Sequence, residues 1–104
     1  MRLVWRPEAL VDRDRIMERI SQDSPEAAAD LDEMFESKGE IARQRPTLYR
    51  KGRVEGTREI VAASNYVVVY TIKKECVEVL RVMHARQHWP SIERDAYKDG
   101  NTDK

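Results

Sequence analysis

The sequence predicts an α+β fold in which a short N-terminal strand and a helical hairpin pack on an antiparallel β-meander. Two patterns predict it: apolar residues recur every three to four positions in the first half of the chain and every second position in the second half. A third observation is the length of 104 residues, which suffices for one domain but not for a second core. The expected order is therefore strand, two helices, three-stranded meander and tail.

The first strand and the first helix are expected near the N-terminus. Residues 3–5 form a short apolar run that ends before Pro7, and proline suits the first turn of a helix. Along this helix, one broad apolar face is predicted from Leu10, Ile16, Met17 and Ile20.

The second helix has the clearest start signal in the chain. Ser24 is a hydroxyl cap, Pro25 takes the first helical position, and Glu26 adds an acid to the first turn. The apolar stripe that follows is interrupted only by Lys38 and consists of Ala27, Ala28, Leu31, Met34, Phe35, Ile41 and Ala42. Because the link between the two helices is short, they should form an antiparallel hairpin.

The second half of the chain reads as a loop followed by a meander. Residues 44–57 lack periodicity and contain one proline and two glycines. Runs rich in β-branched residues follow at 58–63, 66–72 and 77–84, separated by polar turns that suit hairpins. The middle run is apolar on both faces, which predicts a central strand with its neighbours at or nearer the edges. The domain should span residues 1–90, and the polar residues 91–104 should fray.

The charge balance excludes some classes of protein. Nineteen basic and nineteen acidic residues give a formal net charge of zero, which argues against a uniformly basic protein that gathers nucleic acid or anionic membrane. Two blocks underlie this neutrality, with a net charge of −6 over residues 22–40 and +5 over residues 41–58. They form either a basic surface for a partner or solvated faces that pair with each other.

Other features bound the cellular setting. No apolar run approaches the roughly 18 residues of a membrane span, and the N-terminus lacks the apolar stretch of a signal peptide. The single cysteine, Cys76, excludes an internal disulfide and a cysteine-rich zinc site. We therefore expect a small cytoplasmic domain with no cofactor and no membrane partner.

Three segments resemble the RelE/ParE toxins of bacterial toxin–antitoxin modules. They are residues 54–61 with a Gly-x-Arg-Glu motif, residues 65–70 with a strand bounded by tyrosine, and residues 77–87 with a last strand running into His-x-Arg. The resemblance covers about residues 1–90, and the expected order of elements matches the fold of that family. The pair Trp89-Pro90 is similar to the ParE-like branch.

The resemblance implies one of two activities. RelE-like members are ribosome-dependent ribonucleases that cleave mRNA, whereas ParE-like members poison DNA gyrase. The ribonucleases carry basic residues on the sheet and a tyrosine near the C-terminus, and this chain matches the basic residues at Arg58 and Arg86. It has Ile60 and Val67 where the nuclease branch tends to have bases, and the next tyrosine is Tyr97. The comparison favours the ParE-like branch.

A ribonuclease would need a general acid, a general base and cations for the phosphorane charge. Under this alternative the catalytic residues are Arg58, His84, Arg86 and His88. The two histidines also fit structural roles, one ending a strand beside the helices and one in a turn. No third ligand stands at a recognisable spacing, so no metal site is expected.

A gyrase-directed toxin would instead present a protein-binding surface at the end of the last strand. Its predicted target-binding residues are Arg81, Arg86, His88 and Trp89. Trp89 suits a partner surface because it adjoins a proline outside regular structure, whereas Trp5 suits the core. The basic loop residues Arg50, Lys51 and Arg53 fit either a contact with DNA, RNA or an acidic partner, or a solvated loop.

The preferred hypothesis is therefore a ParE-like toxin of a type II toxin–antitoxin module that stalls DNA gyrase without catalysis of its own. The resemblance implies a cognate antitoxin that lies across the helical hairpin and a sheet edge. One alternative is a RelE-like endoribonuclease that acts on mRNA at the ribosome; another is an inactive member that only binds the antitoxin. A pI near 6.7 weakens the ribonuclease alternative, because RelE-like nucleases tend to be strongly basic.

Overall fold

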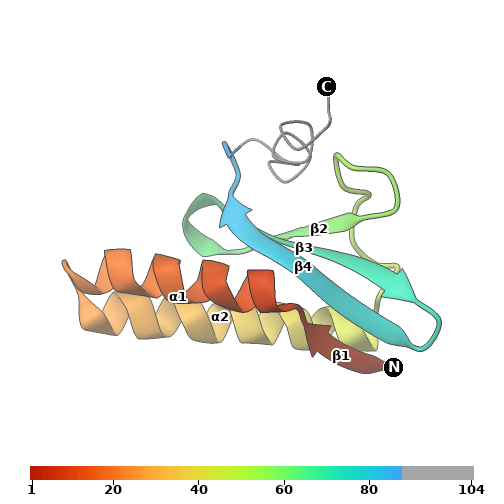
Figure 1. The fold of residues 1–104 in the computed structure, drawn as a ribbon, viewed down its shortest axis with the longest axis horizontal. Coiled ribbons are helices and arrows are strands. Elements are labelled where there is room, and N and C mark those ends of the chain that lie inside the picture. Colours follow the sequence, from red (N-terminus) through yellow and green to blue (C-terminus); the bar gives the residue numbers. More distant parts are fainter. Residues whose placement is uncertain (88–104) are drawn as a thin grey trace.

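The computed structural model describes residues 1–87. In order, the elements are β1 (Arg2–Trp5), α1 (Pro7–Ser21), α2 (Pro25–Gln44), β2 (Arg58–Val61), the 3₁₀ turn η1 (Ala63–Asn65), β3 (Tyr66–Lys73) and β4 (Cys76–His84) (Figure 1). The predicted order of strand, helical hairpin and meander is confirmed. His88, Trp89, Tyr97 and the tail predicted to fray lie outside the described residues.

The four strands form one mixed sheet in the order β1-β4-β3-β2. Strands β2, β3 and β4 are the predicted antiparallel meander, and β1 adds to it in parallel, with Arg2 opposite Cys76 and Trp5 opposite Val79. The expectation that both neighbours of the middle strand lie at or near an edge holds for β2 only. Strand β4 is flanked by β3 and β1, and beyond Val79 its outer edge runs alongside α1.

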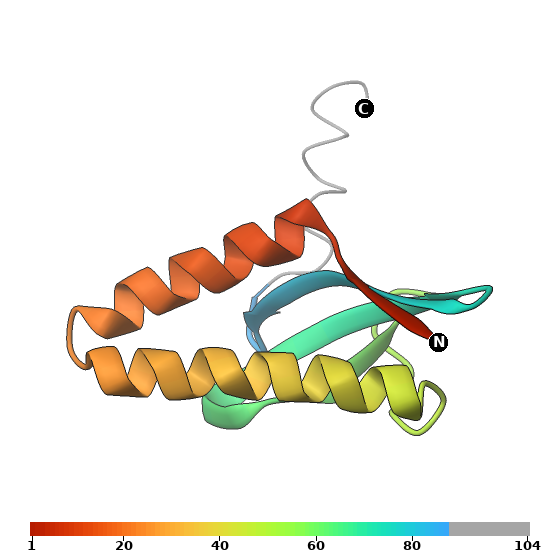
Figure 2. The same ribbon diagram turned by 90° about the horizontal axis from the view of Figure 1, so that it is seen from below.

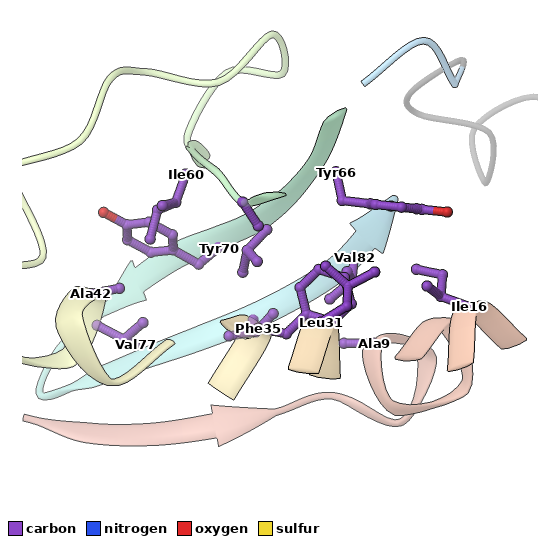
Figure 3. Close-up of a cluster of buried hydrophobic side chains, with 13 residues drawn as sticks. Ala9, Ile16, Leu31, Phe35, Ala42, Ile60, Tyr66, Tyr70, Val77 and Val82 are labelled. Atoms are coloured by element: carbon purple, nitrogen blue, oxygen red, sulfur yellow. The ribbon is translucent and has the colours of Figure 1, made fainter. Parts of the chain in front are cut away.

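The two faces of β3 are both buried, as the alternation of the sequence predicts. Tyr66, Val68 and Tyr70 point into the core beneath the two helices (Figure 3), while Val67 and Val69 pack with Met83 on the opposite face. A register shift between Val69 and Tyr70 marks a β-bulge against β4.

The helical hairpin covers one face of the sheet, with both helices joined at a tight turn and diverging toward β1 (Figure 2). Ser24 caps α2 by accepting a hydrogen bond from the Ala27 N–H at 3.1 Å, as predicted. The apolar stripe of α2 is largely confirmed by the burial of Ala28, Leu31, Phe35 and Ala42, but Met34 is 37% exposed and Ala27 is exposed as well.

The predicted apolar face of α1 is wrong at Leu10, which is 46% exposed. Ala9 and Ile16 are buried from this helix, and the two charged residues Asp12 and Arg13 are buried between them. The reason is that α1 lies against the edge of β4 and against α2, where ion pairs rather than apolar contacts fill part of the interface.

A glycine in α2 allows the helix to approach β1 closely. A Cβ atom on Gly39 would lie 2.7 Å from Cζ2 of Trp5, and the Trp5 ring stacks against the Arg13 guanidinium at 4.6 Å. We therefore expect Gly39→Ala to lower the free energy of unfolding by about 1 kcal/mol or more, because overpacking outweighs the gain of about 1 kcal/mol in helix propensity.

Urea denaturation measures this effect, and Ser37→Ala at an exposed position of α2 is the control. The control gains helix propensity without a clash, so its stability should stay the same or rise. A stabilised Gly39→Ala protein would contradict the close approach of Trp5.

Candidate functional site

Those predicted target-binding and catalytic residues that fall within residues 1–87 lie on β2, on β4 and in the turn that follows β4. Arg81 and His84 belong to β4, Arg86 follows in the turn, and Arg58 begins β2. His84 is paired with Tyr66 at one end of β3, whereas Arg58 is paired with Tyr70. The structure therefore brings His84 and Arg86 to one end of the sheet, whereas Arg81 lies opposite Val69 and Arg58 opposite Tyr70.

Arg81 is joined to Asp12 of α1 by two hydrogen bonds. Its Nε donates to Oδ2 at 2.8 Å and its Nη2 to Oδ1 at 3.0 Å. The same Oδ2 accepts the backbone N–H of Val82 at 2.9 Å, at a point where β1 no longer covers the edge of β4. These hydrogen bonds raise the pKa of Arg81 above its ordinary value. Asp12 was not among the predicted site residues, because nothing in the local sequence of α1 indicates a partner on β4.

His84 is held in a compact turn at the end of β4. Its ring meets Tyr66 edge-on, with 5.4 Å between ring centroids, and its Nδ1 accepts the backbone N–H of Arg86 at 3.2 Å. Its own backbone N–H donates to Oε1 of Gln87 at 3.1 Å. An Nδ1 that accepts a hydrogen bond carries no proton, so the neutral ring is protonated on Nε2. The contact with Tyr66 agrees with the structural alternative for His84.

Arg86 is exposed in the turn after β4. Within residues 1–87 its guanidinium forms no ion pair, in contrast to Arg81. Of the predicted target-binding residues that the structure describes, Arg86 is thus the one presented to solvent.

Arg58 is turned away from this end of the sheet. Its Nη1 donates to the carbonyl oxygen of Tyr49 at 2.6 Å, in the loop after α2. At about 3.3 Å per residue, the strand positions opposite Arg58 and His84 are separated by about 13 Å along β3. Arg58 and His84 of the four-residue catalytic set therefore stand at different levels of the sheet, and His88 lies outside the described residues. Ile60 and Val67 are 1% and 0% exposed. They stand at the positions where the nuclease branch tends to have basic residues.

The basic loop folds back onto the sheet. Glu59 of β2 is 3% exposed and accepts three hydrogen bonds from Arg53, from Nε at 3.0 Å, from Nη2 at 3.3 Å and from the backbone N–H at 3.1 Å. Arg53 also donates to the carbonyl oxygens of Ala85 at 3.4 Å and Gln87 at 3.3 Å. Arg53 therefore links β2 to the turn that carries Arg86.

The acidic and basic blocks of the sequence pair with each other in part, through the ion pair between Glu40 and Arg43 on α2. Among the described residues, Asp32 and Glu36 of α2 pair with Arg13 of α1, whereas Arg50 and Arg53 pair with Glu59. These further ion pairs of the two blocks are made with residues outside both of them, Arg13 and Glu59.

Glu59 gives the molecule a defined response to acid. Burial raises the pKa of Glu59, but the hydrogen bonds and the charge of Arg53 outweigh this effect and hold the pKa below the ordinary value of 4.5. The stabilisation by the ionised Glu59 carboxylate is therefore complete above pH 4.5. It is lost as the pH falls through the pKa that Glu59 has in the folded protein.

We expect Glu59→Gln to lower the free energy of unfolding at pH 6, and the difference from wild type to shrink toward pH 3. Other carboxylates contribute equally to both proteins and cancel in the difference. Urea denaturation at the two pH values measures it. A difference that stays constant over this range would show that the ionised Glu59 carboxylate adds nothing to stability.

A pocket of about 220 Å³ opens between α1 and the end of β4. We call it the α1–β4 pocket, and its polar lining consists of Asp12, Arg15, Arg19, Tyr66, Arg81 and Gln87. Arg15 and Arg19 were not among the predicted site residues; they are spaced four residues apart on α1 and so face the same side of the helix.

Neither a metal cluster nor a membrane helix is found in the part of the chain that the structure describes. No group of three or more His, Cys, Asp or Glu side chains is placed to hold a metal ion within residues 1–87. No helix in the same range is long and apolar enough to cross a membrane.

Comparison with known proteins identifies the family. Residues 3–89 match the model of the family described as ParE toxin of type II toxin-antitoxin system, parDE. The chain belongs to the ParE toxin family. Its membership implies a cognate antitoxin as partner and agrees with the resemblance noted in the sequence.

Two relatives of this ParE-family chain illustrate the match. The protein named "Putative toxin Y4kP" of Sinorhizobium fredii is 37% identical over 92 residues, which cover 88% of this chain and 95% of the relative. The solved structure titled "Chromosomal ParDE TA system from P. aeruginosa" superposes with a TM-score of 0.73 at 19% identity, over 83% of this chain and 97% of that chain. The second comparison supports the fold described above.

Proposed function

We propose that this ParE-family toxin acts by binding DNA gyrase and stalling it, and that its cognate antitoxin holds it inactive. Gyrase works on DNA in the cytoplasm, which is therefore the proposed place of action. The observation that carries the proposal is that Ile60 and Val67, at 1% and 0% exposure, are buried at positions where the ribonuclease branch tends to have basic residues.

The chemistry of RNA cleavage explains why this observation matters. Cleavage through a 2′-hydroxyl needs a base, an acid and cations within reach of a single phosphate. Here the Arg58 side chain donates to the Tyr49 carbonyl oxygen. At about 3.3 Å per residue, the position opposite Arg58 on β3 lies about 13 Å from the position opposite His84. A toxin that works by binding a protein has no such requirement, and the exposed Arg86 suits a contact with an acidic surface.

An experiment in cells separates the two activities. The toxin is induced without its antitoxin, the topology of a reporter plasmid is read on a chloroquine gel, and mRNA 5′ ends are mapped in the same cells. We expect relaxed or linearised plasmid and unchanged mRNA ends. New mRNA ends within translated codons, with normal plasmid topology, would overturn the proposal in favour of the ribonuclease. Unimpaired growth with neither change would point to an inactive member that only binds its antitoxin.

Arg86→Ala provides the matched variant. Because Arg86 is exposed and forms no ion pair within residues 1–87, its loss should leave the fold intact. We expect about a tenfold higher toxin concentration for half-inhibition of gyrase, the size typical of a side chain that contributes to an interface. Arg2→Ala, at an exposed position on the far end of β1, is the control and should inhibit like wild type. Equal inhibition by all three proteins would exclude Arg86 from the target surface.

A further inference from the structure

The α1–β4 pocket has a polar lining that presents hydrogen-bond donors. The pocket lies where the last residues of β4 pass α1. It adjoins the apolar core that contains Tyr66 and Ile16 (Figure 3). Three guanidinium groups, from Arg15, Arg19 and Arg81, line it with a single carboxylate, that of Asp12. The pocket therefore carries an excess of positive charge in a chain whose formal net charge is zero.

The acceptors in the pocket already receive hydrogen bonds from the protein. The Asp12 carboxylate accepts from Arg81 and from the Val82 N–H. The Tyr66 oxygen accepts from Nη2 of Arg19 at 2.7 Å, and Oε1 of Gln87 accepts from the His84 N–H at 3.1 Å. A ligand that donates hydrogen bonds would therefore find these acceptors occupied.

The donors, in contrast, have capacity left. The Tyr66 hydroxyl accepts through its oxygen, which leaves its O–H to donate, and the Gln87 side chain retains its NH₂ group. Arg15 is exposed at the mouth and has no ion pair with any other described residue. The ligand that matches this set is an anion with two acceptor oxygens, which a guanidinium binds in parallel geometry.

We propose that the α1–β4 pocket binds the carboxylate of an aspartate or glutamate side chain from the cognate antitoxin. A volume of about 220 Å³ accommodates one side chain of this kind. The surroundings favour a peptide over a nucleic acid: the exposed apolar Leu10 and Val11 lie on the same helix, and so do the exposed acids Asp14 and Glu18. A nucleic-acid backbone carries a phosphate at every step and would be repelled by these acids along its length, whereas a peptide can present a single carboxylate to the pocket and place apolar residues on Leu10 and Val11.

The test measures how fast the toxin–antitoxin complex exchanges. The complex with the antitoxin encoded beside the toxin gene is purified with a labelled antitoxin, an excess of unlabelled antitoxin is added, and the loss of label is followed. We expect Arg15→Glu in the toxin to accelerate exchange about 10- to 100-fold, as for the loss of a partly desolvated charge pair. Replacing one acidic residue of the antitoxin by lysine should restore slow exchange with this variant.

Two further variants make the result decisive. Tyr66→Phe keeps the ring beside His84 and Phe35 but removes the O–H donor, and should accelerate exchange by a smaller factor, about five- to tenfold. Arg2→Glu makes the same charge change far from the pocket and should exchange like wild type. Circular dichroism and a thermal melt confirm that each variant is folded.

Exchange of Arg15→Glu at the wild-type rate would overturn the proposal, and so would equal acceleration by Arg2→Glu. If Arg15→Glu instead weakens the retention of a DNA fragment while antitoxin exchange is unchanged, the pocket is a nucleic-acid site and the proposal is also wrong. Failure of any antitoxin acid-to-lysine change to restore slow exchange would contradict it as well. No gyrase is present in this measurement, so its outcome is independent of the gyrase proposal.

Discussion

Replacing Asp12 by alanine is expected to lower the free energy of unfolding by about 3–5 kcal/mol, the cost of breaking a buried ion pair by removing one partner. The Asp12 and Arg81 side chains are only 9% and 13% exposed, so water cannot replace the lost contact at low cost. The same change removes the acceptor of the buried Val82 N–H. Because single domains are stable by about 5–15 kcal/mol in total, this loss would remove a large share of the stability of the protein.

Asp14→Ala is the matched control, since Asp14 lies on the same helix at an exposed position. Its free energy of unfolding should stay within about 0.5 kcal/mol of wild type. Asp12→Asn keeps an acceptor for Val82 and should fall between wild type and Asp12→Ala. Guanidinium denaturation followed by circular dichroism gives all three values. Equal stability of the Asp12→Ala and Asp14→Ala proteins would show that the contact with β4 contributes nothing.

Arg13→Ala is expected to have the second largest effect, a loss of about 3 kcal/mol. Nε and Nη2 of Arg13 donate to the two oxygens of Asp32 at 2.8 Å each, and the guanidinium stacks on the Trp5 ring at 4.6 Å. The hydrogen bonds to Asp32 raise the pKa of Arg13 above its ordinary value, so the guanidinium keeps its charge. The Arg13 side chain is 10% exposed, so removing either Arg13 or Asp32 leaves the other charge without its partner at a poorly solvated position.

A double-mutant cycle with Asp32→Ala isolates the contribution of this pair. We expect the double variant to be less destabilised than the sum of the two single variants. Arg13→Lys tests the geometry, because an ammonium cannot donate in parallel to two carboxylate oxygens, and it should remain clearly less stable than wild type. Additive effects of the two alanine variants would mean that Arg13 stabilises the fold through Trp5 alone.

The adjacent residues Asp12 and Arg13 explain why the buried face of α1 was predicted less well than the rest of the fold. Asp12 binds a strand that lies 69 residues away in the sequence, and Arg13 binds a residue 19 positions away on α2. Hydrophobic periodicity assigns a buried face by apolar residues alone, so it placed Leu10 inside and left both charged residues outside. Only the three-dimensional arrangement shows that the helix turns its charged side toward the interface.

The sheet was easier to predict because the pleat imposes a strict alternation. The residues of β3 that were expected to share a face do so, and the antiparallel meander follows from the short turns between its strands. The parallel pairing of β1 with β4 could not be predicted, because β1 has only four residues and its sequence does not indicate which strand it pairs with. That pairing is what leaves the end of β4 beside α1, where the α1–β4 pocket forms.

The site was predicted in part. The end of β4 is where His84 and Arg86 meet, as the His-x-Arg motif suggests, but Arg81 is engaged by Asp12 of α1. Arg53 was grouped with a basic loop, yet it bonds to Glu59 and to the carbonyl oxygens of the turn after β4. Pairing of this kind depends on distances across the fold, which the order of residues does not encode. The role of Arg81, Arg86, His88 and Trp89 in target binding stays a prediction.

The most direct test of the proposed mechanism is DNA supercoiling by purified gyrase in the presence of the toxin. We expect that the toxin blocks supercoiling of relaxed plasmid, that cleaved DNA bound to gyrase accumulates, and that prior addition of the cognate antitoxin prevents both effects. Undiminished supercoiling at an excess of folded toxin, together with cleavage of mRNA on purified ribosomes by the same preparation, would contradict it.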